Sequence, residues 1–274
     1  MTSSVSSISG DKLTAEPIVN ATQALQGKAA GVQIIASDAP GTASQVIIRG
    51  LGTIQGGREP LYVVDGILTN NINNINTNDI ENISILKDAA SLAIYGNRGA
   101  NGVVIVSTKK GQEGKILFNV DSNFGLRNLS YKVLMADANS FVTFSNEAIY
   151  RDLLTDSNPS NDNSLNNFFP TNQLHNTNWF NEVSQIGVMT NHNVSASLGN
   201  NNMRSFTSFS LNKEEGILIG NLFERATFRN NIGFKVSEKI DYSHNISIQL
   251  ANSTPKNFGI FTSAYKQVPI IPVF

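Results

Sequence analysis

The sequence predicts two kinds of structure in one chain. Residues 1–112 are expected to form a small α+β domain, a mixed sheet with short helices, and residues 113–274 the antiparallel strands of an incomplete transmembrane β-barrel. Three observations lead to this prediction. Short apolar runs ended by glycine fill the first part, and segments of about 10–13 residues that alternate between apolar and polar side chains fill the second. The connections between those segments alternate between long and short.

Short strands are predicted throughout the first part, wherever the chain alternates or carries a brief apolar run. They are expected at Val5–Ser9, Gln45–Ile48, Leu61–Val64, Ile80–Lys87 and Gly102–Lys110. The pair Asp65–Gly66 favours a tight, hairpin-like reversal after the third of these strands. In the fourth strand, Ile83 and Ile85 lie on one face and are expected in the core.

Two helices are predicted between these strands. Within Asn20–Val32, apolar residues recur at helical spacing, with Asn20 as a suitable N-cap and Gly31 as a suitable stop. The stretch Asp88–Gly96 is expected to form a single short helix, capped by Asp88 and stopped by Gly96.

Five longer segments in the second part alternate at the period of a β-strand. They are Lys115–Arg127, Gly187–Gly199, Arg204–Lys213, Phe223–Val236 and Lys239–Ala251. The fourth is representative, because Phe228, Ile232 and Phe234 fall on one face while Arg225 and Arg229 fall on the other. Soluble strands average about 5–6 residues, whereas strands of about 9–11 residues with a polar inner face are typical of transmembrane barrels.

The connections between these segments sharpen the prediction. Asn128–Ile186 is long, Asn200–Met203 is short, the stretch "EEGILIGNL" is intermediate and Ser237–Lys239 is short. Outer-membrane barrels place long loops outside the cell and short turns in the periplasm. A large soluble antiparallel sheet with one wet face is the alternative that the strand pattern leaves open.

Composition excludes several classes of protein. The net charge is −1 with 15% charged residues, which gives no reason to expect nucleic acid as a partner. Cysteine is absent, so disulfides, thiolate metal sites and a cysteine nucleophile are excluded. The sequence contains no run of about 18 apolar residues, so it predicts no transmembrane helix. Residues 1–20 lack the pattern of a signal peptide.

No arrangement of side chains predicts catalysis, a metal or a cofactor. His175, His192 and His244 are scattered without the spacing of a zinc site. The glycine-rich stretch "RGLGTIQGG" follows a strand, but no helix follows it, so it offers no phosphate cradle. The sequence therefore predicts a protein that is not an enzyme. For Trp179, beside Phe180, contact with a sugar or a place at a membrane interface is the alternative to packing within a loop, which is the expected role.

Motifs in family order then suggest a resemblance. The stretches "LQGKAAGVQI", "VIIRG", "LYVVDGILTN" and "IENISILKDAASLAIYGNRGANGVVIVSTKKG" resemble the plug domain of TonB-dependent outer-membrane transporters, and are most similar to the SusC/RagA-type subfamily. Later stretches, "NTNWFNEV", "NHNVSASLG" and "EEGI", resemble the early barrel of that subfamily. The resemblance covers nearly the whole chain.

The resemblance implies a function, partners and a location. Members take up nutrients across the bacterial cell outer membrane when TonB pulls the plug, and SusC-type members import glycans or peptides with a SusD-like surface lipoprotein. Outer-membrane lipid would then surround the strands. The alternative from another class is a soluble periplasmic or surface carbohydrate-binding β-protein without transport.

The sequence departs from the family at both ends. It shows no signal peptide, no preceding accessory domain and no TonB box before Val5, and it carries five strands where the family has about 22. The chain is therefore expected to be an internal fragment that begins at an arbitrary methionine. Five tilted strands cannot close, and open edges are not tolerated in lipid.

The resemblance also suggests candidate site residues. In the family, plug arginines pair with barrel-wall glutamates, and Arg49 and Arg98 are the expected seating residues, with wall partners in strands beyond this chain. An ordinary surface role for both arginines stays open. Five glycines are expected to serve the turns of the plug: Gly50, Gly66, Gly96, Gly99 and Gly102.

Overall fold

The computed structural model describes residues 5–14, 20–37, 39–50, 59–88, 92–114, 116–155 and 168–273. The chain divides into two compact units. The first unit consists of Met1–Arg127, Gly187–Gly216 and Gly220–Pro255, and the second of Asn128–Ile186, Ile217–Ile219 and Lys256–Phe274. Residues 51–58, which contain most of the glycine-rich stretch, lie outside the described residues. Lys115, at the start of one predicted strand, lies outside them as well.

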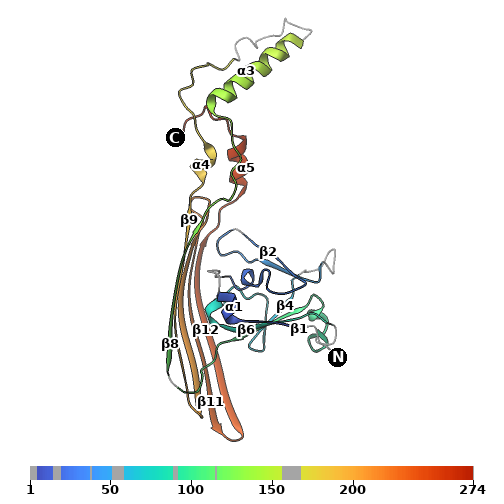
Figure 1. Cartoon of the computed structure of the whole chain (residues 1–274), viewed down its shortest axis with the longest axis vertical. Helices are drawn as coiled ribbons and strands as arrows, with labels where there is room; N and C mark the ends of the chain where they lie inside the picture. Colours follow the sequence, from blue (N-terminus) through green and yellow to red (C-terminus); the bar gives the residue numbers. More distant parts are fainter. Residues whose placement is uncertain are drawn as a thin grey trace. The chain divides into compact units, whose positions relative to one another are not determined.

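A small mixed sheet organises the N-terminal half of the first unit (Figure 1). Its strands are β1 (Val5–Ser9), β4 (Leu61–Val64), β5 (Ile67–Thr69), β6 (Ile80–Leu86) and β7 (Val103–Thr108), in the order β1-β6-β7-β4-β5. Only β4 and β7 run parallel. The central strands are the most apolar, and Ile83, Ile85 and Val104 are completely buried. The predicted short strands are confirmed.

The reversal between β4 and β5 is a two-residue hairpin, as the sequence predicts. Val64 pairs with Ile67, and the two residues between them have positive φ, 48° for Asp65 and 88° for Gly66. Positive φ at both central residues is the geometry that matches the twist of the flanking strands. The Asp65 carboxylate also accepts hydrogen bonds from Thr108, 2.9 Å from its backbone nitrogen and 2.6 Å from its hydroxyl.

Short elements complete the core beneath this sheet. They are α1 (Gly10–Thr14), the 3-10 turns η1 (Gln23–Leu25) and η2 (Thr77–Asp79), and the hairpin of β2 (Val32–Ile35) with β3 (Gln45–Ile48). Buried residues from most of these elements form one apolar cluster with the central strands, and these include Ile8, Leu13, Leu25, Val46, Ile80 and Val106. This small domain therefore has its own core.

The predicted helix over Asn20–Val32 is wrong. Only the single turn η1 forms, and the chain then enters β2 at Val32. Gly27 and Gly31 adopt φ values of 71° and 72°, which a right-handed helix cannot include. Leu25 still reaches the core, because one turn is enough to bury it.

The second predicted helix is partly confirmed. Residues 89–91 lie outside the described residues, and beyond them the chain forms the 3-10 element η3 (Ala93–Gly99). Gly96, the predicted stop, has φ 58° and ψ −148° and produces a kink inside the element. The glycine therefore interrupts the helical path without ending it.

The five long segments form one antiparallel sheet whose strands follow in chain order. They are β8 (Leu117–Arg127), β9 (Gly187–Gly199), β10 (Met203–Glu215), β11 (Leu222–Ser237) and β12 (Ile240–Thr254). All five predicted strands are confirmed. Residues 200–202 and 238–239 form the short turns, and in the first the Asn200 side chain accepts hydrogen bonds from the backbone of Asn202 and Met203.

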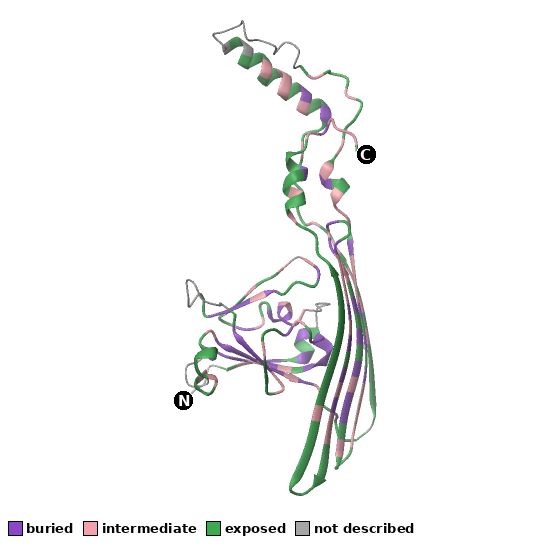
Figure 2. Ribbon diagram, turned by 180° about the vertical axis from the view of Figure 1, so that it is seen from behind, coloured by how far each residue is buried: buried purple, intermediate pink, exposed green. Residues whose placement is uncertain are grey.

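The two faces of this sheet differ in polarity as the alternation predicts. Apolar side chains on one face are exposed, for example Val120 at 74% and Leu250 at 73%. Polar side chains on the other face are buried, for example Asn193 at 1% and Thr227 at 2%. Figure 2 shows the small sheet largely buried and the edge strands β8 and β12 largely exposed. This is the reverse of a soluble sheet, whose apolar face is the covered one.

The second unit combines three segments that are distant in sequence. It contains α3 (Ala138–Thr155), α4 (Trp179–Val183) and α5 (Gly259–Lys266). Phe180 packs between Phe261 and Tyr265, with ring centroids 5.0 and 5.1 Å away. Trp179 begins α4 instead of lying in a loop, and it donates its indole N–H to the carbonyl of Val268, in the loop after α5, at 2.8 Å.

Among the residues that the structure describes, no helix is both long enough and apolar enough to cross a membrane.

A polar interface between the small domain and the long strands

The inner face of the long sheet is covered with polar side chains that are nevertheless buried. They come from alternate positions of three neighbouring strands, β9, β10 and β11, and all are less than 8% exposed: Asn191, Asn193, Ser195, Ser208, Ser210, Asn212, Arg225, Thr227, Arg229 and Asn231. We call this set the inner wall. Because alternate residues of a strand point to the same side, a period-two sequence is sufficient to build it.

Hydrogen bonds join the small domain to the inner wall at three points. The Asn76 side-chain amide donates to the side-chain oxygen Oδ1 of Asn191 at 3.4 Å. The Arg225 guanidinium donates to the backbone carbonyl of Asn73. Asn231 donates both to the Thr108 hydroxyl at 2.9 Å and to the backbone carbonyl of Lys109 at 2.8 Å.

One buried ion pair crosses the same interface. Nε of Arg229 lies 3.6 Å from Oδ2 of Asp79, and the two side chains are 5% and 1% exposed. Local geometry presents the carboxylate, because the Asn76 side chain caps η2 by accepting from the backbone of Asn78 at 2.9 Å. Asp79 then stands at the junction of η2 and β6.

Burial dominates the electrostatics of Asp79. It raises the pKa of this carboxyl above its usual value, and the neighbouring Ser208, Arg229, Lys109 and Arg225 oppose that rise in this order. No hydrogen bond joins the carboxylate to Nε of Arg229, and the Ser208 hydroxyl is the polar group that most lowers this pKa. Taking two charges out of water is costly unless hydrogen bonds compensate them. The Arg229 guanidinium, 3.6 Å away, therefore offsets only part of the cost of burying this carboxylate.

Two further contacts fix how closely the surfaces approach. Gly41 has φ 68°, and a Cβ at that position would overlap the ring of Phe223 on β11. Thr108 donates its hydroxyl to Asp65 while it accepts from Asn231, so the β4–β5 turn, the end of β7 and the inner wall form one hydrogen-bonded chain.

Comparison with known proteins identifies this pairing of a small domain with long strands. Residues 1–103 match the TonB-dependent receptor plug domain. TonB-dependent receptor P26 of Formosa agariphila is 34% identical over 288 residues, which take in 100% of this chain and 27% of that receptor. The TonB-dependent receptor SusC of Bacteroides thetaiotaomicron is 32% identical over 245 residues, 85% of this chain and 23% of that receptor.

A solved structure shows the same arrangement. The RagAB peptide importer in its open-open state aligns with a TM-score of 0.81 at 26% identity, over 94% of this chain and 31% of that chain. The chain belongs to the SusC/RagA-type TonB-dependent receptors. It spans about a quarter of the length of the curated relatives that it matches.

Membership of this family names the parts of the first unit. The small domain is the plug, the five long strands are part of the barrel, and the chain is an outer-membrane protein. The soluble carbohydrate-binding alternative is therefore disfavoured. The relatives are receptors and importers, not enzymes.

The arginines predicted from the sequence lie away from the contacts described above. Arg49 is exposed, has φ 59° and donates its backbone N–H to Gly31 at 2.9 Å. Arg98 is exposed in the last turn of η3. Their role in seating the plug stays a prediction, because it requires strands beyond those of this chain.

The five predicted turn glycines differ in geometry. Gly50, Gly66, Gly96 and Gly102 have positive φ, whereas Gly99 does not. At Gly102 a Cβ would also come within 2.8 Å of the Ile48 side chain, so a larger residue there would strain both backbone and packing.

Sequence reasoning missed the residues that do meet across the interface. The alternation places Arg225 and Arg229 on the polar face of a strand but does not indicate what covers them. The available signal was the presence of two arginines on the inner face of one strand. Because buried arginines require hydrogen-bond acceptors, this pattern indicates that acceptors lie opposite them. Asp79 lies in the polar stretch "NTNDIE", where nothing local distinguishes it from its neighbours.

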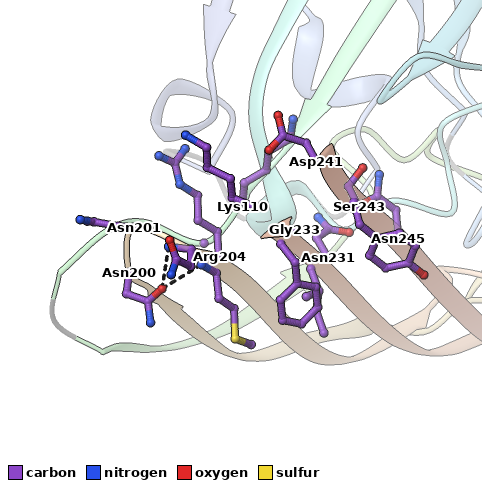
Figure 3. A pocket seen from close by; sticks show the side chains of 16 residues that line it. Lys110, Asn200, Asn201, Arg204, Asn231, Gly233, Asp241, Ser243 and Asn245 are labelled. Carbon is purple, nitrogen blue, oxygen red and sulfur yellow. Dashed lines mark hydrogen bonds between the residues drawn. The ribbon is translucent and has the colours of Figure 1, made fainter. Parts of the chain in front are cut away.

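Two cavities of the first unit border the plug and the inner face of the strands. The larger, about 490 Å³, lies at the strand ends joined by the short turns, where Lys110, Arg204 and Asp241 contribute to its lining (Figure 3). The smaller, about 340 Å³, lies toward the opposite strand ends, and Arg225 contributes to its lining. Among the described residues, no group of three or more potential ligand side chains could hold a metal ion.

Proposed function

We propose that the complete protein containing this chain takes up a nutrient, a glycan or a peptide, across the outer membrane by an energised mechanism. The plug closes the barrel lumen, TonB supplies the force that displaces it, and a SusD-like surface lipoprotein delivers the substrate. The protein carries out no catalysis. The observation that carries this proposal is the buried polar interface between plug and inner wall.

The chemistry of the interface suits a part that must move. The plug keeps its own apolar core, with Ile83 and Val104 completely buried, so displacement need not expose it. Its contacts to the long strands are mainly hydrogen bonds and one ion pair with no hydrogen bond between its partners, with the Phe223 ring beside Gly41 as an apolar contact. Water can replace such contacts as they part, whereas an apolar interface would lose the full free energy of burial.

The decisive test removes one partner of the buried pair. Arg229→Gln leaves the Asp79 carboxylate buried without its nearest cation, which costs about 3–5 kcal/mol in comparable buried pairs. In planar bilayers, the complete receptor carrying this change should open its lumen at lower urea than the parent. A second change, Asp79→Asn, made in the same protein should recover most of the loss, because no unpaired carboxylate remains.

A matched control separates this effect from the loss of any wall arginine. Arg204 lies on β10 of the same sheet, but its side chain is 59% exposed and pairs with Glu113. Arg204→Gln should therefore leave the opening of the lumen unchanged. Uptake should further require TonB in intact cells. If Arg229→Gln opens no more readily than Arg204→Gln, the interface does not hold the plug, and uptake that persists without TonB would refute the energised mechanism.

We also propose that Arg49 and Arg98 help to seat the plug against wall strands beyond this chain. A guanidinium can pair bidentately with a wall carboxylate, more firmly than a lysine could. Arg49→Ala and Arg98→Ala should each increase channel opening in urea without abolishing barrel formation. If both variants stay as closed as the parent under the same urea, the two residues are surface arginines.

The division of the chain is part of the same proposal. Residues 1–112 would form the plug domain and residues 113–274 the beginning of the barrel. Limited proteolysis of the chain in detergent should leave a resistant core that ends near Lys110. Protection of the whole chain as one resistant piece would contradict this division.

A further inference from the structure

Uncharged amides are the largest group of side chains that line the smaller cavity of the first unit. Its volume is about 340 Å³, and its lining combines plug residues with strand residues. The amide-bearing residues are Asn20, Gln23, Asn71, Asn73, Asn74 and Gln249. Each amide can donate two N–H groups and accept through its oxygen without adding charge. Such a lining suits a polar ligand better than an apolar one.

One buried cation in this lining has unused hydrogen-bonding capacity. Arg225 is 6% exposed, and its Nη1 donates to the Asn73 carbonyl. Its Nη2 has no hydrogen-bond partner among the described residues. The Phe223 ring lies 6.0 Å from the guanidinium carbon, which orients the group but offers no oxygen. Buried donors are almost always satisfied in folded proteins, so an acceptor from outside the chain is expected here.

Among the described residues that line this cavity, positive charge is in excess, since Arg127 and Arg225 stand against Glu214. Arg127 pairs with Glu214 at 3.6 Å, and Arg229 pairs with Asp79 at 3.6 Å. Glu214 and Asp79 also attract Arg225, but each has another arginine as its ion-pair partner. Among the carboxylates of the described residues, none is therefore left to pair with Arg225 alone.

The cavity lies near the strand ends from which a substrate would arrive. Arg127 ends β8, Glu214 is the penultimate residue of β10 and Phe223 is the second residue of β11. These ends adjoin the long connection over residues 128–186, and outer-membrane barrels place their long connections outside the cell.

We propose that this cavity binds an oxyanion of the transported substrate: a carboxylate, sulfate or phosphate group. Nη2 of Arg225 donates to it, and the surrounding amides bind neighbouring hydroxyl or peptide groups. A charge-assisted bond from a guanidinium to an oxyanion is roughly twice as strong as a neutral one. The inference rests on the proposed uptake function for its claim that the oxyanion belongs to a substrate.

The test measures the binding of inorganic sulfate to the purified complete receptor by calorimetry at constant ionic strength. The parent should bind sulfate, and Arg225→Gln should weaken binding by about tenfold or more. Because Arg225 also holds Asn73, a second variant is needed that leaves this contact in place. Gln249→Glu adds a competing carboxylate to the lining and should weaken sulfate binding similarly.

Arg204→Gln is the matched control for loss of an arginine. This residue lies on the same sheet outside the smaller cavity and already pairs with Glu113, so sulfate affinity should not change. Equal affinity in the parent, Arg225→Gln and Gln249→Glu would overturn the proposal. Absence of sulfate binding to the parent would overturn it as well.

Competition then identifies the source of the oxyanion. Three competitors represent three sources of an oxyanion: trigalacturonate is an acidic sugar, galactose 6-sulfate a sulfated sugar and trialanine a peptide with a terminal carboxylate. The compound that displaces sulfate most strongly identifies the class of substrate. If none of them displaces sulfate, the site is not a substrate subsite. Uptake assays with and without TonB test the proposed function separately, because equilibrium binding does not require energy. Arg225-dependent binding with TonB-independent uptake would refute only the uptake mechanism.

Discussion

The plug and the barrel strands use the same apolar residue types in opposite places. In the plug, Ile83 and Val104 are completely buried, whereas on the strands Val120 and Leu250 are 74% and 73% exposed. The polar residues reverse in the same way, since the strands bury Asn193 and Thr227 at 1% and 2% exposure. The difference teaches that each region is folded for a different solvent.

Lipid and water impose these opposite patterns. A strand that faces hydrocarbon gains by exposing apolar side chains to it and must pair every backbone group in the sheet. The plug has water or polar wall around it, and therefore hides its apolar side chains in its own core. The two regions meet mainly through polar surfaces, and the Phe223 ring beside Gly41 is an apolar exception.

The largest effect is expected in the plug core. Ile83 lies on β6, which pairs with β1 and β7, and its side chain is fully buried. Ile83→Ala should lower the free energy of unfolding of the plug by about 2–5 kcal/mol. Ile94→Ala, at a site that is 81% exposed, should stay within about 0.5 kcal/mol. Hydrogen exchange of the plug amides in the complete receptor measures both. Equal losses would mean that the plug has no core of its own.

Arginine on the strand faces sharpens the comparison from the other side. Phe228 and four further residues, Ile232, Phe234, Ile246 and Ile248, are expected to face lipid. Phe228→Arg should cost about 2–4 kcal/mol near the bilayer midplane. Asn245→Arg, on the inner face, should cost much less. Urea unfolding from lipid vesicles measures the difference, and equal costs on both faces would contradict the barrel orientation.

The pH dependence of plug seating tests the interface between the regions. Because burial raises the pKa of Asp79, the seated plug binds a proton there more readily than the unfolded chain does. Its contribution to seating is full below the usual pKa of 3.8 and is lost as pH rises through the higher folded pKa. In the parent, the stability of plug seating should therefore fall as the pH rises between these two pKa values. Asp79→Asn should remove this contribution to the dependence of seating on pH. Identical slopes in the two proteins would assign the pH dependence to other groups.

An exposed ion pair in the second unit gives the smallest expected effect. Arg151 and Glu147 pair four residues apart on α3, with side chains 75% and 54% exposed. Glu147→Gln should cost only about 0.3–0.5 kcal/mol. Thermal unfolding followed by hydrogen exchange of α3 would detect it. A cost as large as that of Arg229→Gln would show that burial is not what makes the interface pair important.

Local patterns were enough to place most strands. The predicted segment Gly187–Gly199 coincides with β9, and the Asp65–Gly66 reversal forms as expected. Both follow from rules that act over a few residues, the period-two alternation and the conformational preference for positive φ. The same kind of rule failed over Asn20–Val32, because helical spacing of apolar residues says nothing about two glycines that adopt a left-handed backbone.

The sequence by itself determined which face of each long strand is polar and that the first part has a separate apolar core. Only the tertiary structure decided which polar residues meet. Asp79 and Arg229, like Asn73 and Arg225, come together from elements far apart in the chain. Many asparagines and two arginines on the inner wall were equally suitable partners by type. The choice among them depends on how the plug docks, because hydrogen bonds and ion pairs act only over a few ångströms. The periodicity of a strand does not indicate which distant residue will come that close.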